Sequence, residues 1–145
     1  MPYWHERHPD HRETSKLVER AVFLAGLEKV VTAQEIYRPK VLLFYPMRYE
    51  SPLSFVVDIS EVAEAKYKLI DLYDSQVRSR TSEKTTLVSS TLSSLALRAR
   101  DTYLGSLIGC PAAEGYFTRN AVPINDPISH FRQSSVDRSC YFQFR

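Results

Sequence analysis

The stretch FVVDISEVAEAKYKLIDLY at residues 55–73 joins two patterns that decide the fold class. Its first five residues form a short apolar run rich in β-branched side chains, which predicts a strand of an inner sheet. The second part places apolar residues on one helical face, namely Val62, Ala65, Leu69, Ile70 and Tyr73. Ser60 precedes this face, and its hydroxyl is placed to accept hydrogen bonds from the N–H groups of the first turn. A strand that leads directly into a helix predicts an α/β fold.

Two further elements are expected on the N-terminal side of this stretch. The run Val41-Leu42-Leu43-Phe44-Tyr45 follows Pro39 and is apolar throughout, which predicts a second strand. Residues 12–25 repeat apolar side chains at helical spacing, and Gly26 follows where a helix C-cap glycine is common. The sequence therefore predicts a helix before the two strands.

The C-terminal side of the stretch contains a second long helix. Residues 92–107 repeat Leu, Ala and Tyr at helical spacing, and Gly109 and Pro111 are typical of a helix end. Before it, residues 78–91 are dense in Ser and Thr and are expected to form a mobile surface connection. After it, residues 121–127 are expected to form a short extended segment.

The number of strands is small for the kind of sheet that the sequence predicts. Strands that are apolar at nearly every position are covered by helices on both faces and flanked by further strands. Only two or three strands are expected in these 145 residues. We therefore expect the chain to be one part of a larger α/β domain, with residues 133–145 as a tail that shows no periodicity.

Charge and cysteine content exclude several functions and compartments. The 19 basic and 17 acidic residues are spread along the chain without a block of like charge, so no nucleic-acid partner is expected. No apolar run approaches the ~20 residues that span a bilayer, and no signal peptide is recognisable, so no membrane is expected either. Cys110 and Cys140 lie far apart and form no CxxC pair, which favours a reduced, cytoplasmic location.

Three of the four histidines fall within residues 5–11, directly before the first helix. Pro9 suits the first turn of a helix because no N–H is needed there, which puts His8 before the helix and Asp10 and His11 in its opening turn. The neutral imidazole of His11 could hold Zn²⁺. The neighbouring Asp10 could accept a hydrogen bond and fix the orientation of a side chain.

His8 would face such a metal from the loop, where a protonated imidazole could stabilise charge on a carbonyl oxygen. A catalytic zinc site needs three protein ligands, and this segment supplies one, so the others must come from elsewhere. Two histidines near a helix start are also typical of solvent-exposed or capping residues. The pattern alone therefore leaves metal binding and a structural role open.

The segment Pro2-Tyr3-Trp4-His5-Glu6-Arg7-His8-Pro9-Asp10-His11 closely resembles the second signature of the LmbE-like, or PIG-L, deacetylase family. Members of this family often read Pro-Tyr-Trp-x-x-Arg-His-Pro-Asp-His. Further blocks resemble the family in the same order, up to about residue 128. They are 22–27, 37–40, 54–60, Ser75-Gln76, 98–100 with Gly105 and Gly109, and 113–117.

The resemblance implies a Rossmann-like α/β fold and a zinc-dependent deacetylase. Within the family, the pattern is most similar to the bacillithiol-biosynthesis branch, which removes acetate from N-acetylglucosaminyl-malate. By resemblance His11 is a zinc ligand, His8 stabilises the tetrahedral oxyanion, and Asp10 is the acidic residue of the same motif. Arg7 and Arg38 match arginines near the substrate pocket that could bind a carboxylate such as malate.

One family feature is missing from this sequence. Members carry an N-terminal Ala-His-Pro-Asp-Asp signature that supplies the other metal ligands and the general base, whereas the only His-Pro-Asp here is residues 8–10. We therefore expect residues 1–132 to be the C-terminal half of a deacetylase domain that is inactive alone. The alternative is a non-catalytic remnant or a half-domain that needs a separate N-terminal partner chain. A homo-oligomer is a further expected assembly.

Three charged residues of the resembling blocks have a structural interpretation that competes with a functional one. Arg98 and Arg100 are expected to be surface or ion-pair residues of their helix. Glu114 could form a structural ion pair or line the substrate pocket. His5 and His130 are assigned no role.

Overall fold

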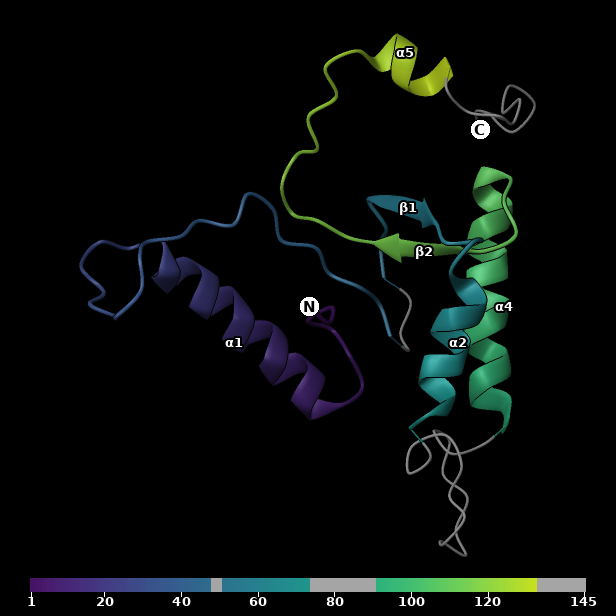
Figure 1. Cartoon of the computed structure of the whole chain (residues 1–145), viewed down its shortest axis with the longest axis horizontal. Helices are drawn as coiled ribbons and strands as arrows, with labels where there is room; N and C mark the ends of the chain where they lie inside the picture. The colour runs from purple at the N-terminus through teal and green to yellow at the C-terminus, as the bar shows by residue number, and fades with distance from the viewer. Residues whose placement is uncertain (48–50, 74–90, 133–145) are drawn as a thin grey trace, which may run out of the picture. The chain divides into compact units, whose positions relative to one another are not determined.

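The computed structural model describes residues 1–47, 51–73 and 91–132, which form four helices and two strands (Figure 1). The mixture of helices with a small sheet agrees with the predicted α/β class. Ser75-Gln76, the tail 133–145, and the Ser- and Thr-rich connection up to residue 90 lie outside the described residues. The elements are α1 (Pro9–Ala25), β1 (Phe55–Asp58), α2 (Ala63–Asp71), α4 (Thr91–Ile108), β2 (Ala113–Tyr116) and α5 (Pro127–Arg132).

Strands β1 and β2 pair with each other in an antiparallel, two-stranded sheet. The backbone N–H of Ser54 donates to the Tyr116 carbonyl at 2.8 Å, and that of Ile59 donates to the Ala112 carbonyl at 3.0 Å. The prediction of a strand at Phe55 to Ile59 is therefore confirmed. Strand β2 was not expected, because its sequence Ala-Glu-Gly-Tyr lacks the β-branched residues by which strands are recognised.

The second predicted strand, at residues 41–45, is shorter than expected. Only Phe44 and Tyr45 pair, Phe44 with Phe117 in an antiparallel bridge and Tyr45 with Pro2 in a parallel one. Because successive residues of an extended chain direct their N–H and C=O groups to opposite edges, these two residues have neighbours on both sides. The prediction of an inner position is thus right, and the predicted length is wrong because the pairing segments are short.

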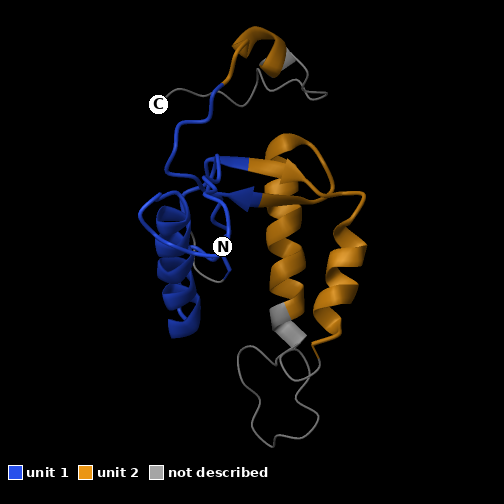
Figure 2. Cartoon of the chain, turned by 60° about the vertical axis from the view of Figure 1, so that its left-hand side comes forward, with its two compact units in different colours: residues 1–55, 115–123 blue, residues 56–114, 124–145 orange. Residues whose placement is uncertain are grey.

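The chain divides into two compact units (Figure 2). Unit 1 consists of residues 1–55 and 115–123 and contains α1 and a cluster of aromatic side chains. Unit 2 consists of residues 56–114 and 124–145 and contains α2 and α4. Its buried apolar core is formed by Ile59, Ala63, Tyr67 and Ala112, with Leu97 packed against it.

The long helices agree with the periodicity of the sequence. Helix α1 begins at Pro9, three residues before the predicted start, and ends at its C-cap residue Gly26. Helix α4 begins at Thr91, one residue before the predicted start, and Gly109 follows it with a φ of 77°, a conformation that favours glycine. No helix among the described residues is long and apolar enough to cross a membrane.

Helix α2 confirms the predicted helix, but the predicted cap is wrong. Val62 is its N-cap residue, and no side chain caps the helix there. The hydroxyl of Ser60 donates instead to the Asp58 carboxylate at 2.6 Å, and the Ser60 N–H donates to the same oxygen at 2.9 Å. Asp58 therefore holds the serine in the turn after β1, away from the first turn of α2.

The segment 121–127 forms no regular strand. Its last residue, Pro127, begins the short helix α5. Asp126 precedes this helix, and its carboxylate accepts hydrogen bonds from the N–H groups of Ile128 and Ser129 at 3.0 and 3.2 Å. The prediction of an extended segment missed this cap, although Asp followed by Pro is a typical helix start.

Candidate functional site

The segment before α1 is held in place by an aromatic cluster in unit 1. The N–H of Tyr3 donates to the Tyr45 carbonyl at 3.0 Å, which aligns the segment with residues 44 and 45. The ring of Tyr3 packs edge-on to that of Phe117 with centroids 5.6 Å apart, and the ring of Trp4 packs edge-on to that of Phe44 at 4.9 Å. Such edge-to-face packing stabilises large rings beyond their burial alone.

Glu6 fixes the next part of the segment. Its side chain is buried, with 2% of the residue exposed, and its Oε1 accepts a hydrogen bond from the Met47 N–H at 2.7 Å. The guanidinium of Arg12, in the first turn of α1, donates to the backbone carbonyls of Glu6 and Arg7 at 2.9 and 3.4 Å. The loop is thereby tied to residue 47 on one side and to α1 on the other.

His8 is the N-cap residue of α1. Its Nδ1 accepts a hydrogen bond from the Asp10 N–H at 3.2 Å, and Pro9 occupies the first helical position, as predicted. The carboxylate of Asp10 lies 3.7 Å from the same Nδ1. A ring nitrogen that accepts a hydrogen bond carries no proton. The contact of Nδ1 with the Asp10 N–H is shorter than its contact with the Asp10 carboxylate, which favours the tautomer with the proton on Nε2.

His8 and His11 lie side by side at the start of α1. Their ring centroids are 5.2 Å apart, His11 is partly buried, and His8 and Asp10 are exposed. This brings together three of the residues that the sequence analysis singled out. In the part of the chain that the structure describes, no group of three or more His, Cys, Asp or Glu side chains is close enough to hold a metal ion.

The two arginines of the predicted substrate pocket do not lie together. Arg7 is exposed in the loop beside His8. Arg38 lies at the opposite end of α1, where its Nη2 donates to the Gly26 carbonyl at 3.2 Å. His11 and Gly26 are separated by roughly 20 Å along the helix axis. Only Arg7 is therefore placed near the histidine pair.

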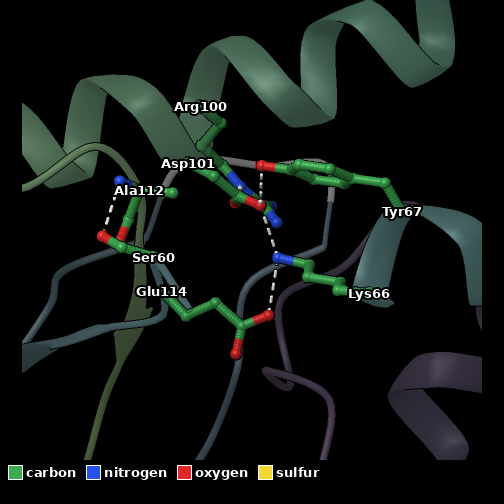
Figure 3. Close-up of polar contacts among 7 residues, drawn as sticks. All are labelled: Ser60, Lys66, Tyr67, Arg100, Asp101, Ala112 and Glu114. Atoms are coloured by element: carbon green, nitrogen blue, oxygen red, sulfur yellow. Dashed lines mark hydrogen bonds and ion pairs between the residues drawn. The ribbon is translucent and has the colours of Figure 1, made fainter. Parts of the chain in front are cut away.

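A partly buried polar cluster in unit 2 includes Glu114 (Figure 3). The ammonium group of Lys66 lies between two carboxylates, 2.5 Å from Asp101 and 2.6 Å from Glu114. The Tyr67 hydroxyl donates to the same Asp101 oxygen at 3.1 Å. Burial raises the pKa of the Tyr67 phenol to about 12, and the nearby negative charge of Asp101 adds to this shift. Glu114 thus forms a structural ion pair, which is one of the two roles considered for it from the sequence.

The arginines of α4 also form ion pairs, as expected. Arg98 lies 2.7 Å from the Glu64 carboxylate, and its guanidinium stacks 3.9 Å above the ring centroid of Tyr67. Arg100 lies 3.8 Å from the carboxylate of Asp101, which is fully buried. The importance of Asp101 was missed, because one acidic residue in an otherwise ordinary helix carries no local signal of burial.

Comparison with known proteins gives a structural likeness and no family assignment. No model of a known protein family matches the chain. The structure is similar to the crystal structure of the conserved protein TT1542 from Thermus thermophilus, with a TM-score of 0.73 and 30% sequence identity. The match covers 85% of this chain and 51% of that protein. The chain therefore shares the fold of part of TT1542 and spans about half of its length.

Proposed function

We propose that the chain is the C-terminal part of a zinc-dependent hydrolase that removes the acetyl group from an N-acetylglucosaminyl conjugate. N-acetylglucosaminyl-malate, from bacillithiol biosynthesis, is the first candidate substrate, and the cytoplasm is the proposed location. The observation that carries the proposal is the pair of histidines at the start of α1, 5.2 Å apart, in a segment that resembles the PIG-L signature.

The histidine pair suits two different tasks. His11 is partly buried, and its imidazole nitrogen is an ordinary zinc ligand. A zinc ion supplies Lewis-acid activation in such hydrolases. His8 uses Nδ1 for the Asp10 N–H, which leaves its Nε2–H free to donate to the carbonyl oxygen of an acetamido group. Asp10 contacts His8, and Arg7 precedes it in the loop, where the guanidinium could bind a carboxylate of the substrate.

The remaining ligands and the general base would come from a polypeptide that the described residues do not include. The partial match to TT1542 supports this proposal, because this chain covers 51% of that protein and the rest has no counterpart here. Strands of the proposed polypeptide would extend the two-stranded sheet of β1 and β2 into the larger, Rossmann-like sheet that the apolar strands predict.

A second candidate function is a non-catalytic half-domain that binds a separate chain. Among the described residues β1 pairs only with β2, so its other edge has no neighbouring strand there. Such an edge can accept a strand from another chain, which favours this alternative. The two candidates share the same assembly and differ only in whether the completed protein holds zinc and hydrolyses an amide.

The test uses this chain fused to the part of TT1542 that it does not match. In the fusion, His11→Ala is expected to remove most of the bound zinc. His8→Ala is expected to keep the zinc and to lower acetate release from N-acetylglucosaminyl-malate by roughly 100-fold, because one oxyanion donor is lost. Zinc content by mass spectrometry and acetate release are the two measurements.

The controls separate the two candidate functions. His5→Ala changes an exposed histidine of the same segment and should alter neither quantity. The unfused chain should release acetate at the background rate only, because it lacks two ligands and a base. Equal zinc loss in the His8 and His11 variants would overturn the proposed roles. A folded fusion without zinc or hydrolysis would favour the non-catalytic half-domain.

A further inference from the structure

A concave site lies in unit 1, at the far end of α1 from the histidine pair. It is a pocket with a volume of about 240 Å³ that is open to solvent. It lies between the last turns of α1, the extended segment 38–42 and Asn120. Its walls are formed by Val22, Phe23, Arg38, Pro39, Lys40, Val41, Leu42 and Asn120.

The charges that line this pocket are all positive. Arg38 and Lys40 are its two ionisable residues, and no acidic side chain lines it. Neither residue forms an ion pair with a described carboxylate. The amide of Asn120 adds a group that can donate hydrogen bonds. Two cations and a donor around one hollow favour an anion over a neutral or cationic molecule.

The guanidinium of Arg38 is already fixed in this pocket. Its Nη2 donates to the Gly26 carbonyl at 3.2 Å, and its Cγ and Nε lie 2.7 and 2.8 Å from where a Cβ on Gly26 would be. Any residue with a side chain at position 26 would displace the arginine. The side chain thus loses little further freedom when it binds a ligand, and a guanidinium has five N–H donors, of which this contact uses one.

The other walls of the pocket are apolar. Phe23, Val41 and Leu42 are large hydrophobic residues, and Phe23 and Val41 are 68% and 49% exposed. A fully hydrated inorganic anion would leave these surfaces in water, whereas a ligand with an apolar body would cover them. The volume is below that of most drug-sized sites, so the ligand is a small molecule or one end of a longer molecule.

We propose that this pocket binds a small carboxylate with an apolar body, such as an aryl or branched aliphatic acid. Arg38 and Lys40 bind the carboxylate, and Phe23, Val41 and Leu42 contact the body. The pocket is roughly 20 Å along α1 from His11, so its ligand is distinct from the substrate of the proposed deacetylase. Binding here requires neither zinc nor hydrolysis.

The test is a fluorescence titration of the full chain with 2-naphthoate at low salt. Saturable binding is expected, with an affinity that falls as salt is raised, because exposed charges are screened. Lys40→Gln should weaken binding roughly tenfold, the usual cost of one charge-assisted hydrogen bond. Lys16→Gln removes the same charge from an exposed position in the middle of α1 that does not line the pocket, and it should leave the affinity unchanged.

Two other probes test the two parts of the proposed ligand. The neutral isostere 2-naphthamide should bind at least tenfold more weakly than 2-naphthoate, and inorganic phosphate should compete poorly. Lys40 is used for the main variant because replacing Arg38 also removes the contact with Gly26. No saturable 2-naphthoate binding, equal binding of 2-naphthamide, equal binding of phosphate, or an affinity unaffected by Lys40→Gln would each overturn the proposal.

Discussion

At the scale of single residues, the position of the histidine pair depends on Glu6. The buried carboxylate of Glu6 accepts a hydrogen bond from the Met47 N–H, and its backbone carbonyl accepts one from the guanidinium of Arg12. His8 follows two residues later as the N-cap of α1. A change at Glu6 therefore acts both on the stability of unit 1 and on the start of the helix that carries His8 and His11.

We predict that Glu6→Ala lowers the free energy of unfolding by about 1–3 kcal/mol, because the Met47 N–H loses its acceptor. Glu6→Gln keeps an acceptor oxygen of the same reach and should cost clearly less. Urea denaturation of the three proteins measures the difference. Equal midpoints for the Ala and Gln variants would show that this hydrogen bond does not hold the loop.

The residues of the candidate site differ in how far the sequence could predict them. The places of His8, Asp10 and His11 at a helix start follow from Pro9 and local rules, and the structure has them there. The burial of Glu6 and Asp101 could not be predicted, because their partners Met47 and Lys66 lie 41 and 35 residues away. Local patterns carry no information about such distant contacts.

At the scale of elements, the packing of α4 depends on a close approach of two backbones in unit 2. A Cβ on Gly105 would lie 2.5 Å from the Cys110 carbonyl oxygen and 2.8 Å from the Ala112 nitrogen. The N–H of Cys110 donates to the Gly105 carbonyl at 3.0 Å. The turn after α4 folds back onto this glycine and leads directly into β2.

We predict that Gly105→Ala destabilises the protein by about 1–3 kcal/mol, although alanine is the better helix former, because the added methyl group meets backbone atoms that cannot move alone. Thermal unfolding followed by circular dichroism measures this cost. Ser106→Ala, at an exposed position one residue further on, is the matched control and should change stability by less than about 0.5 kcal/mol. A Gly105→Ala variant as stable as that control would contradict the close packing.

Helices and strands were not equally predictable for a physical reason. The periodicity of α1, α2 and α4 is a local property of each segment and gave their positions to within a few residues. Strand β2 exists because residues 113–116 lie beside β1, more than 50 residues earlier in the chain, and its own composition does not favour a strand. Pairing across such separations decides which extended segments become strands.

At the scale of the whole molecule, much apolar surface in the described residues has no covering partner. Within those residues strand β1 pairs on one side only, and Val57 in its centre is 42% exposed. Large hydrophobic residues are also exposed on the helices, among them Leu17, Phe23, Leu69, Leu95 and Leu107. This chain matches about half the length of TT1542, so about half of TT1542 has no counterpart here. The proposed assembly would cover such surface.

We predict that the purified chain self-associates through the edge of β1, because unpaired N–H and C=O groups beside apolar residues favour pairing with another strand. Val57→Lys places a charge on this edge and should shift the chain toward monomer in sedimentation velocity and reduce binding of a hydrophobic dye. Thr102→Lys adds the same charge at an exposed position of α4 and should leave the self-association as it is.

Covering the edge with the unmatched part of TT1542, in the fusion described above, should have the same effect as Val57→Lys. A monomeric unmodified chain with a sharp, concentration-independent thermal transition and no dye binding would show that the edge is not used, because the chain would then close its own core.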